Sequence, residues 1–195
     1  MTAPEPPSRP RLEDLDFTSL LEPQAAAKPR QVTAAISEEG LIGQKALETN
    51  GYHVVVARER GTARAGKSVV LVVEDDDDTA QLAVRTLQRG GYATGRAADA
   101  RETSNYLAKL VVPELILLDV QLPGMDGFEM LARMRAHPKL KNVPIVLFTS
   151  RSSREDVVRG LTLGADGYIA KPVAPKVLLE VVGKVLMAGG SGEPL

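Results

Sequence analysis

The sequence predicts an α/β fold in which a parallel, doubly wound sheet of five strands is flanked by five helices. Three observations support this prediction. Short runs rich in Val, Ile and Leu recur between residues 68 and 188, and stretches of helical length separate them. A continuous apolar run is typical of a strand buried on both faces, as in a parallel sheet with right-handed crossovers. Polar residues stand where most of these runs end, at the edge where open α/β sheets bind ligands.

The expected elements follow one another along this region. The first apolar run, Val69–Val73, precedes a helix from about Thr79 to Arg89, which Gly90 and Gly91 terminate. The other expected strands are Tyr92–Arg96, Leu115–Asp119, Val143–Phe148 and Tyr168–Ala170. The other expected helices are Ala100–Leu110, Phe128–Ala136, Arg154–Leu163 and Pro175–Met187. Residues 68–188 therefore form the predicted domain, and residues 189–195 a flexible Gly-rich tail.

The first 30 residues contain closely spaced prolines, which predict a disordered arm. Within this arm, the stretch Leu12–Leu21 (LEDLDFTSLL) places Phe17, Leu20 and Leu21 on one face of a short helix. Such a segment either folds into the groove of a partner or is an ordinary linker with scattered apolar residues. The sequence leaves both interpretations open.

Residues 31–67 are expected to be partly ordered, with a helix at Gln44–Thr49, a stop at Asn50-Gly51 and a strand at His53–Ala57. The phrase ALETNGYHVVV resembles the later TLQRGGYATGR, so this segment is either a degenerate fragment of a second copy of the domain or a chance recurrence. Gly61–Ser68 (GTARAGKS) matches the phosphate-binding P-loop pattern. That mechanism needs a helix after the Lys-Ser pair, whereas a strand-like run follows, which favours a Gly/Ala linker.

The composition narrows the class of protein. The chain has 195 residues, 44% of them hydrophobic, a net charge of −1 and no cysteine. Disulfides and thiolate metal sites are therefore excluded, and nothing points to nucleic acid as a partner. The N-terminus lacks the apolar core of a secretion signal, and no apolar run reaches membrane-spanning length, so a cytoplasmic protein without membrane insertion is expected. The two histidines, His53 and His137, are expected at the surface.

The first strand runs into a block of acids, Glu74–Asp78. Carboxylates gathered at a strand end repel one another, which raises the pKa of each unless a cation joins them. A metal site is therefore one interpretation, and the other is a solvated charge run in which Asp77 or Asp78 caps the next helix. Because the carboxyl ends of parallel strands share one edge, the polar strand ends are expected to form one pocket. These strand ends are Glu74-Asp75, Asp119, Thr149-Ser150 and Lys171.

Four motifs, VVEDDDD, LILLDVQLPGMDGFEML, PIVLFTS and GYIAKP, occur in the order and at the spacing of a known family. In these motifs the chain resembles the response-regulator receiver domain of two-component signalling, which has a flavodoxin-like fold. The resemblance implies that Asp119 is the phosphoacceptor. It also implies that Glu74, Asp75, Asp119 and the backbone carbonyl of Gln121 hold Mg²⁺, a hard ion that prefers oxygen ligands.

The resemblance assigns further roles around the pocket. Thr149 and Lys171 would bind phosphate oxygens, and Lys171 would also offset the charge that develops during phosphoryl transfer. Tyr168 would be the switch aromatic, which turns inward when Thr149 is drawn to the phosphate. Pro172 is the candidate for a cis peptide bond.

The implied function is a phospho-accepting response regulator without a DNA-binding output domain and without enzyme activity beyond its own phosphorylation and dephosphorylation. Its expected partners are a histidine kinase or phosphotransfer protein and a downstream protein, with no nucleic acid. The downstream protein would bind the N-terminal arm or the face formed by the last two helices and the last strand of the domain, and phosphorylation-dependent homodimers are a further expectation. Two alternatives stay open: a Mg²⁺-dependent phosphohydrolase or P-loop NTPase, and a scaffold that is never phosphorylated. Gln121 stands where a phosphatase would need a second acid, which counts against the first alternative.

Overall fold

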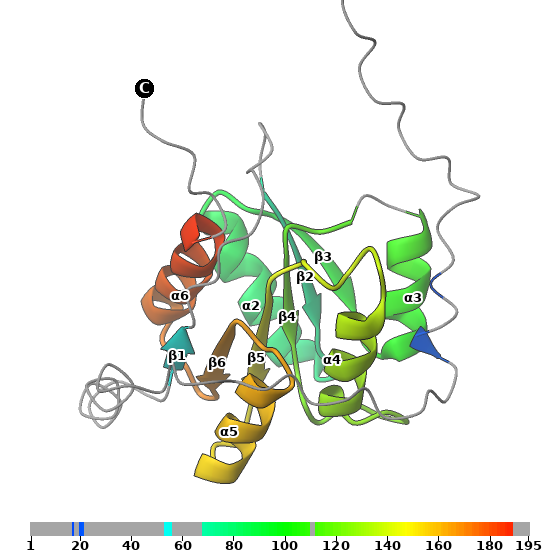
Figure 1. The fold of residues 1–195 in the computed structure, drawn as a ribbon. Coiled ribbons are helices and arrows are strands. Elements are labelled where there is room, and N and C mark those ends of the chain that lie inside the picture. Colours follow the sequence, from blue (N-terminus) through cyan, green and yellow to red (C-terminus); the bar gives the residue numbers. More distant parts are fainter. Residues whose placement is uncertain (1–16, 18–19, 22–52, 56–67, 110–111, 189–195) are drawn as a thin grey trace, which may run out of the picture.

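The computed structural model describes Phe17, Leu20, Leu21, and residues 53–55, 68–109 and 112–188 (Figure 1). The strands are β1 (His53–Val55), β2 (Val69–Val73), β3 (Ala93–Ala97), β4 (Leu115–Leu118), β5 (Ile145–Thr149) and β6 (Gly167–Ala170). The helices are α2 (Asp77–Arg89), α3 (Ala100–Lys109), α4 (Gly127–Ala136), α5 (Arg154–Thr162) and α6 (Pro175–Ala188). Strands and helices alternate from β2 to α6, as predicted.

The sheet has the strand order β1-β6-β5-β4-β2-β3. Strands β2 to β6 are all parallel, which confirms the predicted five-stranded parallel sheet. After β2 the chain adds β3 on one side and then returns past β2 to add β4 on the other. The point where this order reverses lies between β2 and β4, and open α/β sheets bind their ligands at such points. The acidic residues that follow β2 and β4 are therefore placed at the expected position for a site.

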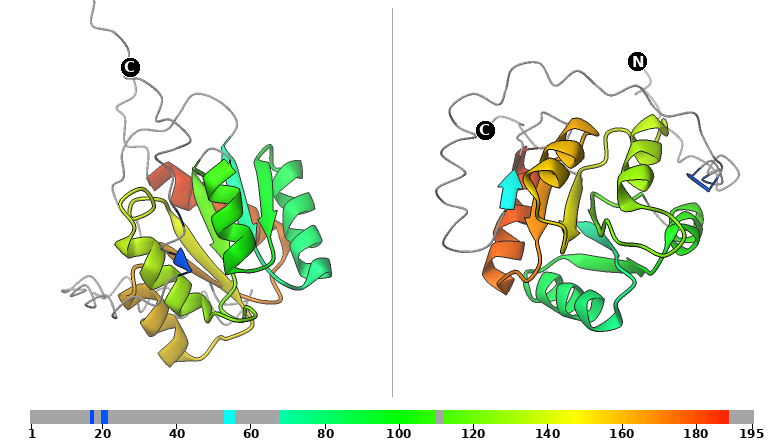
Figure 2. Two further views of the ribbon diagram at one scale, coloured as in Figure 1. Left: turned by 90° about the vertical axis from the view of Figure 1, so that its right-hand side faces the viewer. Right: turned by 90° about the horizontal axis from the view of Figure 1, so that it is seen from below.

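Helices cover both faces of the sheet (Figures 1 and 2). On one face, Leu107 of α3 and Met134 of α4 belong to the same buried cluster as Leu118 of β4, and α5 packs against it. On the other face, Leu87 of α2 and Val182 of α6 belong to a second cluster that includes alternate residues of the same strands. Strands between two apolar layers must be apolar on both sides, which is why the runs in the sequence are continuous rather than alternating.

Helix α2 begins two residues before the predicted start at Thr79. The prediction that Asp77 or Asp78 caps this helix is wrong, because the side chain of Asp76 accepts the Thr79 N–H at 2.8 Å. Ser68 leads directly into β2, as expected for a linker rather than a nucleotide-binding P-loop. Lys67 and the rest of the Gly/Ala linker lie outside the described residues. Among the described residues, no helix has the length and the apolar character needed to cross a bilayer.

Strand β1 adds a sixth, antiparallel strand at the edge of the sheet that the prediction did not include. It corresponds to the predicted strand at 53–57 and pairs with β6, with His53 opposite Ile169 and Val55 opposite Gly167. It also lies against α6. The predicted helix at 44–49 and the stop at 50–51 lie outside the described residues.

Phe17 and Leu20 are almost fully buried, each about 1% exposed, and belong to the core cluster that includes α3 and α4. At these two residues the structure differs from the predicted disordered arm, because apolar side chains that are spaced three apart fill a space on the domain itself. His137 was expected at the surface and is buried instead, because its ring stacks on Phe17 with 4.9 Å between ring centroids.

Candidate functional site

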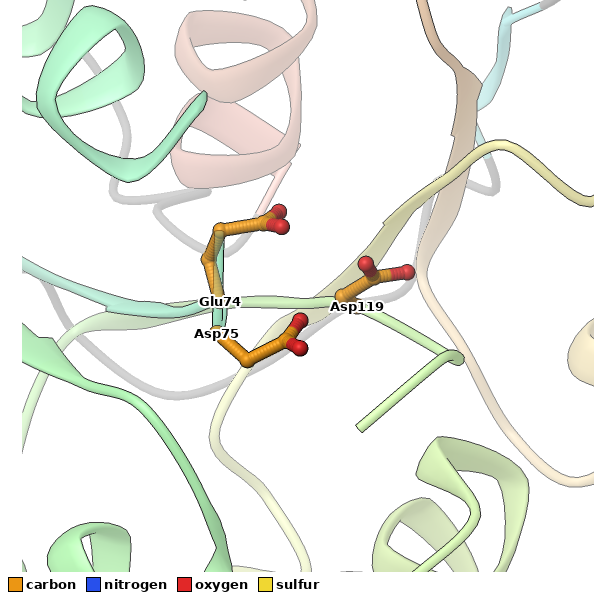
Figure 3. Close-up of side chains that lie close together, drawn as sticks. All are labelled: Glu74, Asp75 and Asp119. Carbon is orange, nitrogen blue, oxygen red and sulfur yellow. The ribbon is translucent and has the colours of Figure 1, made fainter. Parts of the chain in front are cut away.

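Glu74 and Asp119 each follow a strand directly and extend its hydrogen-bond ladder by one residue. The Glu74 N–H donates to the carbonyl of Ala97, and the Asp119 N–H donates to that of Val73, both at 2.9 Å. These bonds hold the two carboxylates at the carboxyl edge of the sheet. With Asp75 they form a cluster in which one ligand oxygen from each residue lies within 4.8 Å of the others (Figure 3).

The three carboxylates differ in exposure. Glu74 is 2% exposed and Asp119 is 4% exposed, whereas Asp75 is exposed to solvent. Burial raises the pKa of Glu74 above its ordinary value of 4.5, whereas the hydrogen bond from Lys171 and its positive charge lower this pKa and offset part of the rise. Two buried acids and one exposed acid therefore form an oxygen-rich cluster that solvent reaches at Asp75.

Lys171, at the end of β6, provides the positive charge of the pocket. Its Nζ donates to Asp119 Oδ2 at 2.8 Å and to Glu74 Oε2. Its backbone N–H donates to the carbonyl of Thr149 at 2.9 Å, which joins the ends of β5 and β6. The peptide bond between Lys171 and Pro172 is cis.

The other oxygen of Asp119 is held by the backbone that follows it. Asp119 Oδ1 accepts the N–H of Val120 at 2.6 Å and that of Gln121 at 3.1 Å. The loop then reaches Asp126, which caps α4 by accepting the Phe128 N–H at 2.7 Å. The carboxylate that was predicted to accept phosphate is thus oriented by backbone amides on one oxygen and by an ammonium on the other.

Thr149 and Tyr168 lie on neighbouring strands, β5 and β6, and both are linked to the backbone of Arg151. The Thr149 hydroxyl is fully buried and accepts the Arg151 N–H at 3.3 Å. The Tyr168 hydroxyl donates to the Arg151 carbonyl at 2.5 Å, and burial raises the pKa of this phenol. The link could not be predicted from the sequence, because it passes through peptide groups, which leave no signal in residue identity.

The structure therefore brings Glu74, Asp75, Asp119 and Lys171 into one constellation, with Thr149 at the end of β5 and Tyr168 within the neighbouring strand β6. The backbone of Gln121 lies beside this constellation, because its N–H donates to Asp119. The cluster offers hard oxygen donors and few of them, which is the donor set that suits Mg²⁺.

A parallel, doubly wound sheet with an acid cluster and a lysine at its switch point defines a class of α/β domains that bind ligands at this edge. The chain belongs to the response regulator family: the family described as "Response regulator receiver domain" matches residues 70–183. Receiver domains bind Mg²⁺ through an acidic pocket of this kind.

Two curated relatives illustrate the relationship. The chain is 41% identical over 120 residues to the transcriptional regulatory protein AfsQ1 of Streptomyces coelicolor, covering 62% of this chain and 52% of the relative. It is 36% identical over 117 residues to the phosphate regulon transcriptional regulatory protein PhoB of Escherichia coli, covering 60% of this chain and 51% of that protein. The chain thus spans about half the length of these relatives.

Solved structures of receiver proteins match over nearly their whole length. A putative response regulator from Chloroflexus aurantiacus has a TM-score of 0.59 and 34% identity, covering 63% of this chain and 99% of that one. The chemotaxis response regulator CheY4 of Vibrio cholerae has a TM-score of 0.57 and 34% identity, covering 62% and 99%. These matches confirm the receiver fold.

Replacing Lys171 with methionine is expected to cause a loss of stability that depends on pH. Without the ammonium, the pKa of the buried Glu74 rises further above 4.5, because the hydrogen bond and the positive charge that lower it are lost, whereas burial and Asp119 still raise it. A carboxyl with a raised pKa in the folded state stabilises that state below its unfolded pKa, and this contribution is lost as pH rises through the folded pKa. The variant should therefore approach wild-type stability below about pH 4.5 and lose about 1–3 kcal/mol at pH 7.

Urea denaturation in EDTA at several pH values measures this effect. Lys184→Met is the matched control, because Lys184 pairs with Glu180 on the exposed side of α6. A loss that is equal at pH 4 and pH 7 would show that Lys171 acts through packing alone.

Proposed function

We propose that this protein is a phospho-accepting response regulator in which Asp119 takes a phosphoryl group from a histidine kinase or phosphotransfer protein. In the transfer, the bond between phosphorus and the donor histidine breaks and a bond from a carboxylate oxygen of Asp119 to phosphorus forms. The observation that supports this most directly is the position of Asp119, which bonds Lys171 and lies in one cluster with Glu74 and Asp75 at the switch point of the sheet.

The acid cluster would hold the ion that this reaction needs. Glu74, Asp75, Asp119 and the backbone carbonyl of Gln121 are the proposed Mg²⁺ ligands. When bound, Mg²⁺ supplies positive charge that neutralises the phosphoryl oxygens. Lys171 holds the Asp119 carboxylate from the other side and would bind a phosphoryl oxygen once the group is in place.

Thr149 and Tyr168 are the proposed switch residues. The Thr149 hydroxyl, whose oxygen accepts the Arg151 N–H here, would donate its own proton to a phosphoryl oxygen, and a charged acceptor makes this hydrogen bond strong. Tyr168 is buried in this structure, with its hydroxyl on the Arg151 carbonyl. Both residues contact the backbone of Arg151, so a movement of Thr149 would also displace the carbonyl that Tyr168 contacts.

The output is proposed to be protein–protein contact through the face of α5, β6 and α6 or through the N-terminal arm. The protein is proposed to act in the cytoplasm. Because β1 pairs with β6, a partner on this face would meet β1 as well. Phosphorylation-dependent homodimers stay a prediction. The two curated relatives are named as transcriptional regulatory proteins, and binding of nucleic acid by this chain forms no part of the proposal.

Incubation with acetyl phosphate and Mg²⁺, followed by intact-mass spectrometry, tests the proposal. The wild type is expected to gain one phosphoryl group, and Asp119→Ala is expected to gain none. Asp78→Ala is the matched control, because Asp78 is an exposed acid of the same run and lies outside the acid cluster. EDTA should abolish the reaction.

Three results would contradict parts of this proposal. An unmodified wild type would favour a scaffold that is never phosphorylated. A phosphorylated Asp119→Ala would show that the nucleophile is another residue. Full phosphorylation in EDTA would exclude a required metal at the acid cluster.

A further inference from the structure

The buried pair Phe17 and Leu20 lies against the domain beside α3 and α4, more than 80 residues away in the sequence. Figures 1 and 2 show these residues, in blue, next to the two helices. The Phe17 ring stacks on His137, which follows α4, with an interplanar angle of 19°. Leu21, in contrast, is 41% exposed. The segment therefore contacts the domain through two specific side chains three residues apart.

Polar side chains from both helices hold the backbone of this segment. The Ser104 hydroxyl, on α3, donates to the Phe17 carbonyl at 3.0 Å. The Arg133 guanidinium, on α4, donates from Nη1 to the Leu20 carbonyl at 2.7 Å. The segment also closes its own turn, since the Leu20 N–H donates to the Phe17 carbonyl at 3.0 Å. Two apolar anchors and a bond from each helix to the backbone are the elements of a site that recognises a short amphipathic segment.

We propose that the groove between α3 and α4 is a peptide-binding site and that Phe17 and Leu20 are the anchors of its tethered ligand, bound in cis. The groove recognises the pattern Phe-x-x-Leu by burying the Phe and Leu side chains. Ser104 and Arg133 set the direction of the bound peptide by donating hydrogen bonds to the carbonyls of Phe17 and Leu20. The tether gives the segment a high effective concentration at the groove. A segment of the same pattern on another protein would therefore have to compete with the protein's own arm. This site is separate from the acid cluster, since it is formed by residues of α3 and α4 and by His137.

Binding of a labelled peptide that spans residues 10–24 to full-length protein tests the proposal by fluorescence anisotropy. The peptide is expected to bind Phe17→Ala/Leu20→Ala, in which the groove is vacated, and to bind the wild type about 100-fold more weakly because the tethered segment competes. Leu21→Ala is the matched control and should behave as the wild type, since Leu21 lies outside the groove. A peptide with Phe17 and Leu20 replaced by alanine should bind neither protein.

A second variant keeps the test valid if the double substitution disturbs folding. A protease site inserted in the sequence between Leu21 and His53 leaves every residue of the segment and the domain unchanged. After cleavage and dilution, the released arm should dissociate, and the labelled peptide should then bind with the affinity measured for the double variant.

Three outcomes would overturn the proposal. The peptide could fail to bind both the double variant and the cleaved protein, although circular dichroism shows them folded. It could bind the uncleaved wild type as tightly as the double variant. Light scattering could also show a wild-type dimer that Phe17→Ala/Leu20→Ala dissociates, which would mean that the segment binds a second copy in trans.

Discussion

Replacing Asp166 with alanine is expected to lower the free energy of unfolding by about 3–5 kcal/mol, because it leaves a buried guanidinium without its carboxylate. Asp166 precedes β6 and is 2% exposed. Its Oδ2 accepts Nη2 of Arg135 and the N–H of Ile145, both at 2.8 Å. Arg135 also donates to the carbonyls of Gly164 and Val143, each at 2.8 Å. The pair thus ties α4 to the start of β5 and to the turn before β6.

Urea denaturation at neutral pH measures the loss. Glu180→Ala is the matched control, because Glu180 is also paired, with Lys184, but on the exposed surface of α6. Exposed pairs contribute little to stability, so this control should leave the denaturation midpoint nearly unchanged. An equal shift for both variants would show that burial does not determine the contribution of these ion pairs.

Replacing Gly127 with alanine is expected to cost about 3 kcal/mol of stability and to displace the loop that contains Asp119. A Cβ at Gly127 would lie 2.1 Å from the Asp119 carbonyl oxygen and 2.6 Å from the Val120 Cα. Both neighbours are backbone atoms, so no side-chain rotation relieves the clash. The N-terminus of α4 would have to move away from the loop, which breaks the 2.8 Å bond from the Gly127 N–H to the Val120 carbonyl.

Gly183→Ala on α6 is the control for this prediction. A Cβ there would meet only the Tyr92 hydroxyl, at an ordinary 3.6 Å. Alanine is the better helix former, so this variant should be more stable than the wild type by about 0.5–1 kcal/mol. Thermal unfolding measures both variants, and acetyl phosphate labelling of Gly127→Ala reports on the Asp119 loop. Equal stability of the two alanine variants would mean that the loop and α4 adjust without cost.

Much of the fold was predictable because continuous apolar runs of this length are compatible with few structures besides a buried strand. Runs such as VVLVV and LILL are short, β-branched or leucine-rich, and are separated by stretches of helical length. The outline of the site followed from the same pattern, since parallel strands end at a common edge. This is why Glu74, Asp119 and Lys171, which are far apart in the sequence, could be expected to meet. Their roles in phosphoryl transfer remain predictions.

The remaining features depend on contacts that local patterns do not specify. The interpretation in which Asp77 or Asp78 caps α2 was wrong because four successive aspartates offer similar caps, and only the path of the chain selects Asp76. A strand was expected at His53–Ala57, but so short a run does not determine which edge of the sheet it pairs with. Likewise, the spacing of Phe17 and Leu20 indicated an apolar face without indicating the groove on the domain itself that buries it.

The antiparallel pairing of β1 with β6 has a consequence for how the domain should be handled. A strand at the margin of a sheet offers unsatisfied peptide groups, which other chains can use to extend it. In this protein His53–Val55 occupies that margin along β6. A shortened chain that starts at Ser68 would expose the peptide groups of β6 along which β1 pairs, and we expect it to self-associate more readily than the full chain.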